Sequence, residues 1–175
     1  MLGEAQDPVF SHGLQASIAY GEPRFSNDID IVADISQNQA DEVKNCFPDS
    51  DFFLEIESIK KAIQQRHQFN IIHPSSGIKI DVIIPARDDF NRSRFSRTKR
   101  LNISETEAAD FAAPEDVIIK KLEYCQMGGS VKHLRDIAGM IKILGSLIDK
   151  AYLNDWTEKL GLSDLWKSVI AKLSK

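Results

Sequence analysis

The chain has 175 residues, enough for one domain with a real core, or for one domain with a small helical appendage. Its 42% apolar and 27% charged residues exclude wholesale disorder and the fibrous classes. No apolar run approaches the ~20 residues of a membrane span, and the first residues lack the apolar segment of a signal peptide. Two cysteines, Cys46 and Cys125, cannot form a disulfide framework, so we expect a cytoplasmic protein with free thiols.

Charge is distributed unevenly along the chain. Residues 1–57 contain 12 acidic and two basic residues, whereas residues 58–175 contain 14 acidic and 20 basic residues. Two interpretations are open at this point. The acidic part forms a metal-binding edge that faces a phosphate-binding one, or the two parts are solvated faces that differ by chance.

The first part of the chain predicts a strand between helical segments. Residues 10–20 are small and apolar around one glycine, which is typical of a strand end that leads into a short helix. Residues 28–34, DIDIVAD, alternate acidic and apolar residues at the period of a strand. Helices are predicted over 36–47 and 58–67, each opened by a serine that can cap it.

The remainder predicts a hairpin followed by helices. Strands at 68–73 and 78–84 flank the turn sequence PSSG, which favours a hairpin. Pro114 suits the first position of a helix, and further helices are predicted at about 130–144, 147–159 and 163–173. We therefore expect an α+β fold with an α/β core over residues 1–112 and a C-terminal helical bundle over residues 113–175.

Three aspartates are the strongest candidates for chemistry. Asp28 and Asp30 leave one face of their strand, because side chains two apart in a strand point the same way. Asp81 is the only acid of its strand and shares a face with Lys79 and Ile83. Neighbouring strands that bring the three carboxylates together would create a site for two divalent metal ions, which clamp the attacking and leaving oxygens of a phosphoryl displacement. For Asp28 and Asp30 alone, the alternative is an exposed strand edge with solvated acids.

These aspartates stand within longer motifs. The run GLQASIAYGEPRFSNDIDIV at 13–32, followed by the acid of the 78–84 strand, resembles the signature of the polymerase-β-like nucleotidyltransferase superfamily. The closer similarity is to small bacterial nucleotidyltransferases of the abortive-infection, AbiEii toxin-like kind. Further matches are FNIIH…KIDVII at 69–84, APEDVIIKKL at 113–122 and LRDIAGM at 134–140, so the resemblance covers nearly the whole chain.

The resemblance implies a nucleotidyltransferase-type mixed sheet and Mg²⁺- or Mn²⁺-dependent transfer of a nucleoside monophosphate from an NTP to a hydroxyl. In it Asp28, Asp30 and Asp81 are catalytic and bind the metal. It further implies an RNA such as tRNA, a protein or a small molecule as the acceptor, and it is compatible with a toxin of a toxin–antitoxin pair that has an antitoxin as partner. The nucleotide-binding residues that the resemblance implies are Gly13, Leu14, Arg24, Ser26, Lys121 and Asp136.

Two of these residues have alternatives of their own. Lys121 falls within the apolar arc of its predicted helix, between Ile118 and Leu122, where a lysine needs a partner or a ligand. The alternative is that its ammonium reaches the surface along the helix. Helical periodicity leaves the direction of Asp136 open, so a structural salt bridge with Arg135 or Lys121 fits as well as a catalytic role.

Leu14 stands where the resembling family has serine or glycine, which let the backbone approach the triphosphate. This difference supports an alternative function, namely a catalytically impaired protein of the same fold that binds a nucleotide or a partner. Arg24 either contacts phosphate or fixes the connector before the Asp-x-Asp pair. The densest basic stretch suits a phosphate backbone or a nucleotide, or is a solvated face; it consists of Arg92, Arg94, Arg97, Lys99 and Arg100, with Phe90 and Phe95 between them.

Overall fold

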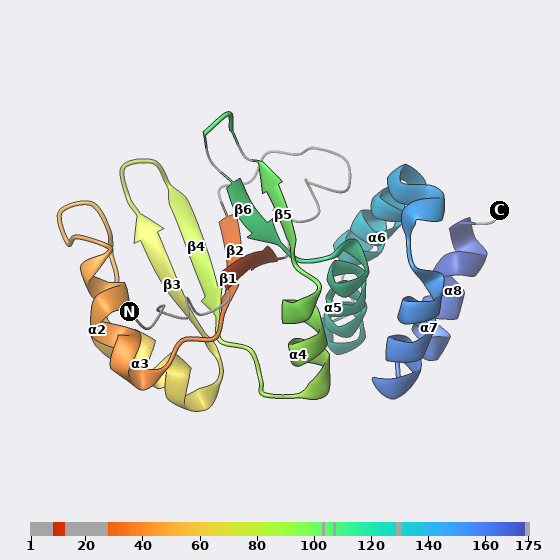
Figure 1. Ribbon diagram of the computed structural model, residues 1–175, viewed down its shortest axis with the longest axis horizontal. Helices are drawn as coiled ribbons and strands as arrows, with labels where there is room; N and C mark the ends of the chain where they lie inside the picture. The colour runs from red at the N-terminus through yellow and green to blue at the C-terminus, as the bar shows by residue number, and fades with distance from the viewer. Residues whose placement is uncertain (1–8, 13–27, 103, 107, 129–130, 174–175) are drawn as a thin grey trace, which may run out of the picture.

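The computed structural model describes residues 9–12, 28–102, 104–106, 108–128 and 131–173. Within them the chain forms a six-stranded mixed sheet in the order β3-β4-β2-β1-β6-β5 (Figure 1). The β2–β4 and β1–β6 pairs are parallel, and the other three pairs are antiparallel. The strands are β1 (Val9–His12), β2 (Asp28–Ala33), β3 (Gln68–His73), β4 (Ile78–Ile83), β5 (Lys99–Asn102) and β6 (Ala108–Phe111).

Helices lie on both sides of the sheet, with α2 and α3 at one end of the molecule and α5 to α8 at the other (Figure 1). The architecture is therefore α+β with helices gathered in the C-terminal third, as the sequence predicts. The described helices are η1 (Gln37–Gln39), α2 (Ala40–Asn45), α3 (Ile56–Gln65), α4 (Asp89–Ser96), α5 (Pro114–Gly128), α6 (Val131–Leu144), η2 (Gly145–Leu147), α7 (Lys150–Lys159) and α8 (Ser163–Leu173). No helix of the described part of the chain has both the length and the apolar character that a membrane crossing needs.

Local sequence signals account for many of these boundaries. Ser36 and Gln39 form a reciprocal capping box at the start of η1, which satisfies backbone N–H groups at the helix start. Pro114 is the first residue of α5, where its missing N–H costs nothing. Gly77 adopts a φ of 69° in the turn between β3 and β4, a conformation that glycine reaches without strain. The predicted hairpin is confirmed.

The sequence patterns missed the segment between β4 and α5. This segment contains α4, β5 and β6, three short elements of eight, four and four residues. Helix α4 begins after Asp88, which caps it by accepting from the Asn91 N–H at 2.7 Å. The polar and charged residues of α4 are spread over all sides of the helix, so its sequence has no apolar stripe from which a helix could be predicted.

One face of the sheet packs against α2 and α3, and we call it the covered face. Ile31 and Ala33 of β2 lie on this face with Val82 of β4, because Ile31 and Val82 are partners in the parallel register. The core on this side also contains Ala40, Leu54, Ile59, Ala62, Ile63, Phe69, Ile71 and Ile84, all buried. Side chains at alternate positions of the same strands must therefore leave the opposite face, which we call the site face.

The C-terminal ends of β2 and β4 bury their site face against the helical third. Val32 belongs to the large core cluster of α5 to α8, and Ile83 packs against that cluster. The fully buried members of this cluster include Val117, Ile118, Ile119, Leu122, Ile137, Met140 and Leu153. The C-terminal end of the site face is therefore apolar and buried. Its N-terminal end carries Asp28, Asp30, Lys79 and Asp81.

A buried polar network joins the sheet half of the chain to the C-terminal helices. Asp116 of α5 is fully buried and accepts a hydrogen bond from the Tyr152 hydroxyl of α7 at 2.6 Å. Burial raises the pKa of Asp116 above its usual value, and this outweighs the hydrogen bond from Tyr152 and the positive charges of Arg97 and Arg94, which lower it. The folded protein therefore holds a proton on Asp116 more tightly than the unfolded chain does.

The sign of this shift predicts how stability depends on pH. Stabilisation from protonated Asp116 is complete below the pKa of an unfolded aspartate, about 4, and it is lost as the pH rises through the higher folded pKa. Asp116→Asn keeps an oxygen for the Tyr152 hydroxyl and cannot ionise, so the variant should gain stability relative to the wild type as the pH rises from about 4. Urea unfolding of both proteins at several pH values measures this difference, and parallel stability curves would contradict the assignment.

Candidate functional site

The site face brings together the three aspartates that the sequence singles out. Asp30 of β2 and Asp81 of β4 are direct partners in the parallel register, and Asp28 is the partner of Lys79. Partners in neighbouring strands point to the same side of the sheet, so all four side chains leave the site face. Asp28 is exposed, Asp30 is half-buried, and the Asp81 side chain is only 14% exposed.

Lys79 lies among these acids. Its Nζ atom is 2.8 Å from Asp81 Oδ2 and 3.9 Å from Asp28 Oδ1. The hydrogen bond to Asp81 raises the pKa of the Lys79 ammonium, and the charges of Asp81, Asp28 and Asp30 raise it further against the effect of burial. Sequence reasoning did not assign Lys79 a role, although the alternation of the strand already placed it on the same face as Asp81.

Asn70 of β3 contacts Asp81 from the other side. It is the antiparallel partner of Asp81, so the register again puts both side chains on the site face. In the amide orientation that satisfies its nitrogen and its oxygen, Asn70 donates to Asp81 Oδ1 at 2.7 Å. The sequence patterns missed Asn70, and its polar side chain at an alternate position of an apolar strand, QFNIIH, is the signal that would have found it.

The donor chemistry of the three aspartates fits a hard divalent cation, which prefers carboxylate oxygens. Their present geometry does not hold one, because within the described residues no three histidine, cysteine, aspartate or glutamate side chains converge as a metal site. Two of the carboxylates, those of Asp81 and Asp28, instead lie beside the Lys79 ammonium. The metal set that the sequence predicts therefore remains a prediction.

Helix α5 borders the site. Val32 of β2 lies in the same core cluster as Val117 and Leu122 of α5. Burial raises the pKa of the Tyr124 hydroxyl, and the charge of Asp30 raises it further. Tyr124 is 38% exposed, and its ring stacks on His133 of α6 with centroids 5.7 Å apart. Lys120 lies 5.6 Å from the centre of the Tyr124 ring.

Lys121 and Asp136 pair with each other. Lys121 Nζ donates to Asp136 Oδ2 at 2.7 Å, and the two side chains are only 5% and 10% exposed. Lys121 therefore lies in the buried arc of α5, as the helical wheel predicts, and the pair joins α5 to α6. Of the two interpretations of Asp136, the structure displays the salt bridge with Lys121.

Four of the predicted nucleotide-binding residues, Gly13, Leu14, Arg24 and Ser26, lie outside the described residues, so their roles stay predictions. The described strand β1 ends at His12, which directly precedes Gly13 in the sequence. The backbone partner of His12 in β2 is Asp30. Strand β1 thus ends beside one of the candidate catalytic acids, Asp30.

Comparisons with known proteins give a likeness among the solved structures. No protein-family model and no curated protein matches the sequence. A solved structure, an antigenic nucleotidyltransferase-like protein from Paracoccidioides brasiliensis, is similar with a TM-score of 0.49 and 21% sequence identity. The match covers 78% of this chain and 68% of that one.

The basic stretch of the sequence is largely engaged within the protein. Arg94 is buried and donates to Asn91 Oδ1 at 2.7 Å, while Arg97 donates to Glu115 Oε2 at 2.7 Å. Arg100 pairs with Asp110, and exposed Arg92 pairs with Asp89. These contacts explain the density of arginines by packing, since Arg97 ties the end of α4 to the start of α5.

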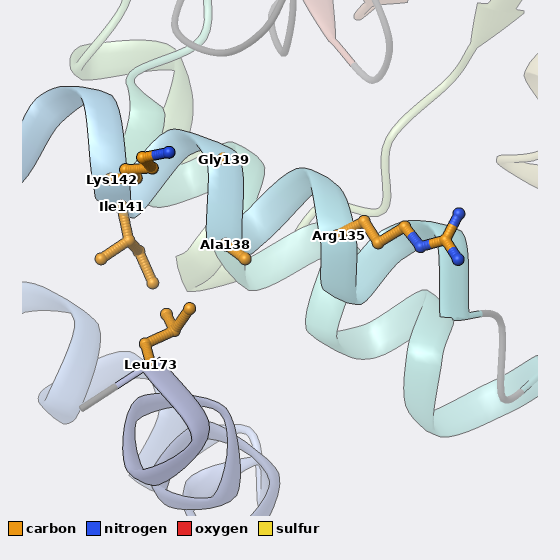
Figure 2. Close-up of a pocket in the computed structure, with 6 residues that line it drawn as sticks. All are labelled: Arg135, Ala138, Gly139, Ile141, Lys142 and Leu173. Carbon is orange, nitrogen blue, oxygen red and sulfur yellow. The ribbon is translucent and has the colours of Figure 1, made fainter. Parts of the chain in front are cut away.

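A groove lies between α6 and the end of α8 (Figure 2). Its volume is about 500 Å³, and Ile141 and Leu173 point toward one another across it. None of the predicted site residues lines this groove, so it is separate from the carboxylates. Its lining consists of Arg135, Ala138, Gly139, Ile141, Lys142 and Leu173.

Proposed function

We propose that this chain is a nucleotidyltransferase that moves a nucleoside monophosphate from an NTP to a hydroxyl of an RNA or protein acceptor, with Mg²⁺ or Mn²⁺ as cofactor. The observation that carries the proposal is the register of β2 and β4, which sets Asp30 opposite Asp81 and puts Asp28 on the same face. A divalent cation bound by these carboxylates would supply charge neutralisation of the phosphates and activation of the acceptor hydroxyl.

The surroundings of the acids support this proposal. The C-terminal end of the site face is covered by the core that contains α5, because Val32 of β2 lies in the same cluster as Val117 and Leu122. The sequence motif that resembles the nucleotidyltransferases begins directly after His12, whose backbone partner in β2 is Asp30. Three acids on one face, together with the phosphate-binding motif that the sequence predicts after His12, support metal-dependent nucleotidyl transfer.

The direct test is transfer of label from an α-labelled NTP in the presence of Mg²⁺ or Mn²⁺, with each of the four NTPs and with a tRNA mixture or the protein itself as acceptor. Asp30→Asn should lower the rate by more than about 100-fold, because it removes a carboxylate that would bind the metal and so stabilise the charged transition state. Asp51→Asn, on an exposed turn away from the sheet face, is the matched control and should retain the wild-type rate.

A second candidate function is nucleotide binding without transfer. The arrangement that favours it is the Lys79 ammonium among carboxylates that do not converge on a metal position. Calorimetric titration with ATP separates the two functions. ATP binding without transfer of label to any acceptor would support the binding protein, whereas transfer that is lost in Asp30→Asn supports the enzyme.

A further inference from the structure

The site face carries its own cation. The strand register delivers Lys79 to the acids, because Lys79 is the partner of Asp28 and is two residues from Asp81 on the same strand. No loop has to close to bring the ammonium there. The resulting contacts are 2.8 Å to Asp81 and 3.9 Å to Asp28, and the Lys79 side chain is 39% exposed.

This placement bears on how a divalent cation could enter. A metal bound to Asp81 and Asp28 needs the carboxylate oxygens that Lys79 now contacts. The ammonium and the metal would also repel each other, since both are positive. Lys79 has a flexible four-carbon stem and an exposed route to solvent, so it can leave the acids without a change in the backbone.

We propose that Lys79 is a resident counter-ion that occupies the cation position between Asp28 and Asp81 and competes with the divalent metal for it. The inference rests on the proposed function, because the metal is the one that nucleotidyl transfer needs. It accounts for the disagreement between a donor set suited to metal and a geometry that does not hold one. Metal binding then includes displacement of Lys79, and in the metal-free protein Lys79 offsets part of the negative charge of the acids.

The consequence is that removal of the Lys79 charge strengthens metal binding. Loss of a partly exposed ion pair and of its competing charge corresponds to about a three- to tenfold lower Kd for the metal. Lys79→Met keeps the length of the side chain and removes the charge, and Lys79→Gln does the same with a polar end. Lys79→Arg keeps the charge and should leave the Kd near the wild-type value.

The experiment is titration of each full-length protein with Mn²⁺ alone, with free Mn²⁺ measured by electron paramagnetic resonance. We expect Lys79→Met and Lys79→Gln to bind Mn²⁺ three to ten times more tightly than the wild type, and Asp81→Asn to lose most of the binding. Lys61→Met, which removes an exposed lysine of α3, is the charge-matched control and should bind as the wild type does. Circular dichroism melting without metal checks that each variant is folded, and Mn²⁺ should raise the Tm of Lys79→Met more than that of the wild type.

The outcomes separate this inference from the proposed function. Equal or weaker Mn²⁺ binding by both neutral variants, with clear binding by the wild type, overturns the role of Lys79 and leaves the metal site in place. Absence of Mn²⁺ binding in the wild type and in the folded neutral variants overturns the inference together with the metal dependence of the proposed function. Tighter binding by Lys61→Met to the same extent would show a general charge effect and would also overturn it.

Discussion

Lys121→Met is expected to lower the free energy of unfolding by about 3–5 kcal/mol, because it removes one charge of a buried ion pair. The pair is short, at 2.7 Å, and both side chains are almost completely shielded from water. The double variant Lys121→Met with Asp136→Leu should recover most of this loss, since replacement of both charges by apolar groups removes the cost of burying them. Urea unfolding of the three proteins measures the effect, with Lys132→Met on the exposed side of α6 as control.

The same variants decide what Lys121 does for a ligand. If the pair only joins α5 to α6, the double variant binds ATP as the wild type does once it is folded. If Lys121 also contacts phosphate, as the sequence resemblance implies, the double variant loses more affinity for ATP than for AMP. A single variant as stable as the wild type would contradict the buried pair itself.

Arg97→Met has the second large expected effect, a loss of about 3 kcal/mol in the free energy of unfolding. Arg97 lies 2.7 Å from Glu115 and 3.5 Å from Asp116, and its guanidinium lies 3.7 Å from the centre of the Tyr152 ring. Its loss leaves two buried carboxylates without their cation and removes a contact between α4 and α7. The side chain of Arg97 is 29% exposed, which places the effect at the lower end of the range for buried pairs.

The pH dependence of this loss is the sharper measurement. Burial raises the pKa of Asp116, so its protonation removes uncompensated charge as the pH falls, and the destabilisation by Arg97→Met should shrink between about pH 7 and pH 4. Arg92→Met is the matched control from the same helix, because its ion pair with Asp89 is exposed and worth little. Equal losses in both variants, or a loss that does not change with pH, would refute the role of Arg97.

The sequence predicted those features that depend on periodicity within one element. The alternation of DIDIVAD and IKIDVII predicts the face from which each aspartate leaves its strand, and the helical wheel predicts the burial of Lys121. The hairpin β3–β4 follows from a turn sequence with proline and glycine. In each case the deciding signal lies within about a dozen neighbouring residues, where local geometry is regular.

Features that depend on pairing between distant segments were not predictable in this way. The contact of Asn70 with Asp81 needs the register of the hairpin, and the placement of Lys79 beside Asp28 needs the parallel register of β2 and β4. The arginines of the basic stretch look like a solvated or nucleic-acid face in sequence, because their buried partners Glu115 and Asp116 belong to a later helix. Tertiary contacts decided these three points.

Packing on the covered face also keeps the parallel register of β2 and β4, and with it the alignment of the acids, from slipping. A slip of β4 by one residue would turn Asp81 to the covered face, among isoleucines, and would turn Ile80 and Val82 out of their core. The free-energy penalty of that slipped register comes from side chains of the covered face, which point away from the acids. Selection for a well-packed covered face would thereby keep Asp30 opposite Asp81. Substitutions in that core should therefore disturb the alignment of the carboxylates, although they lie on the other face of the sheet.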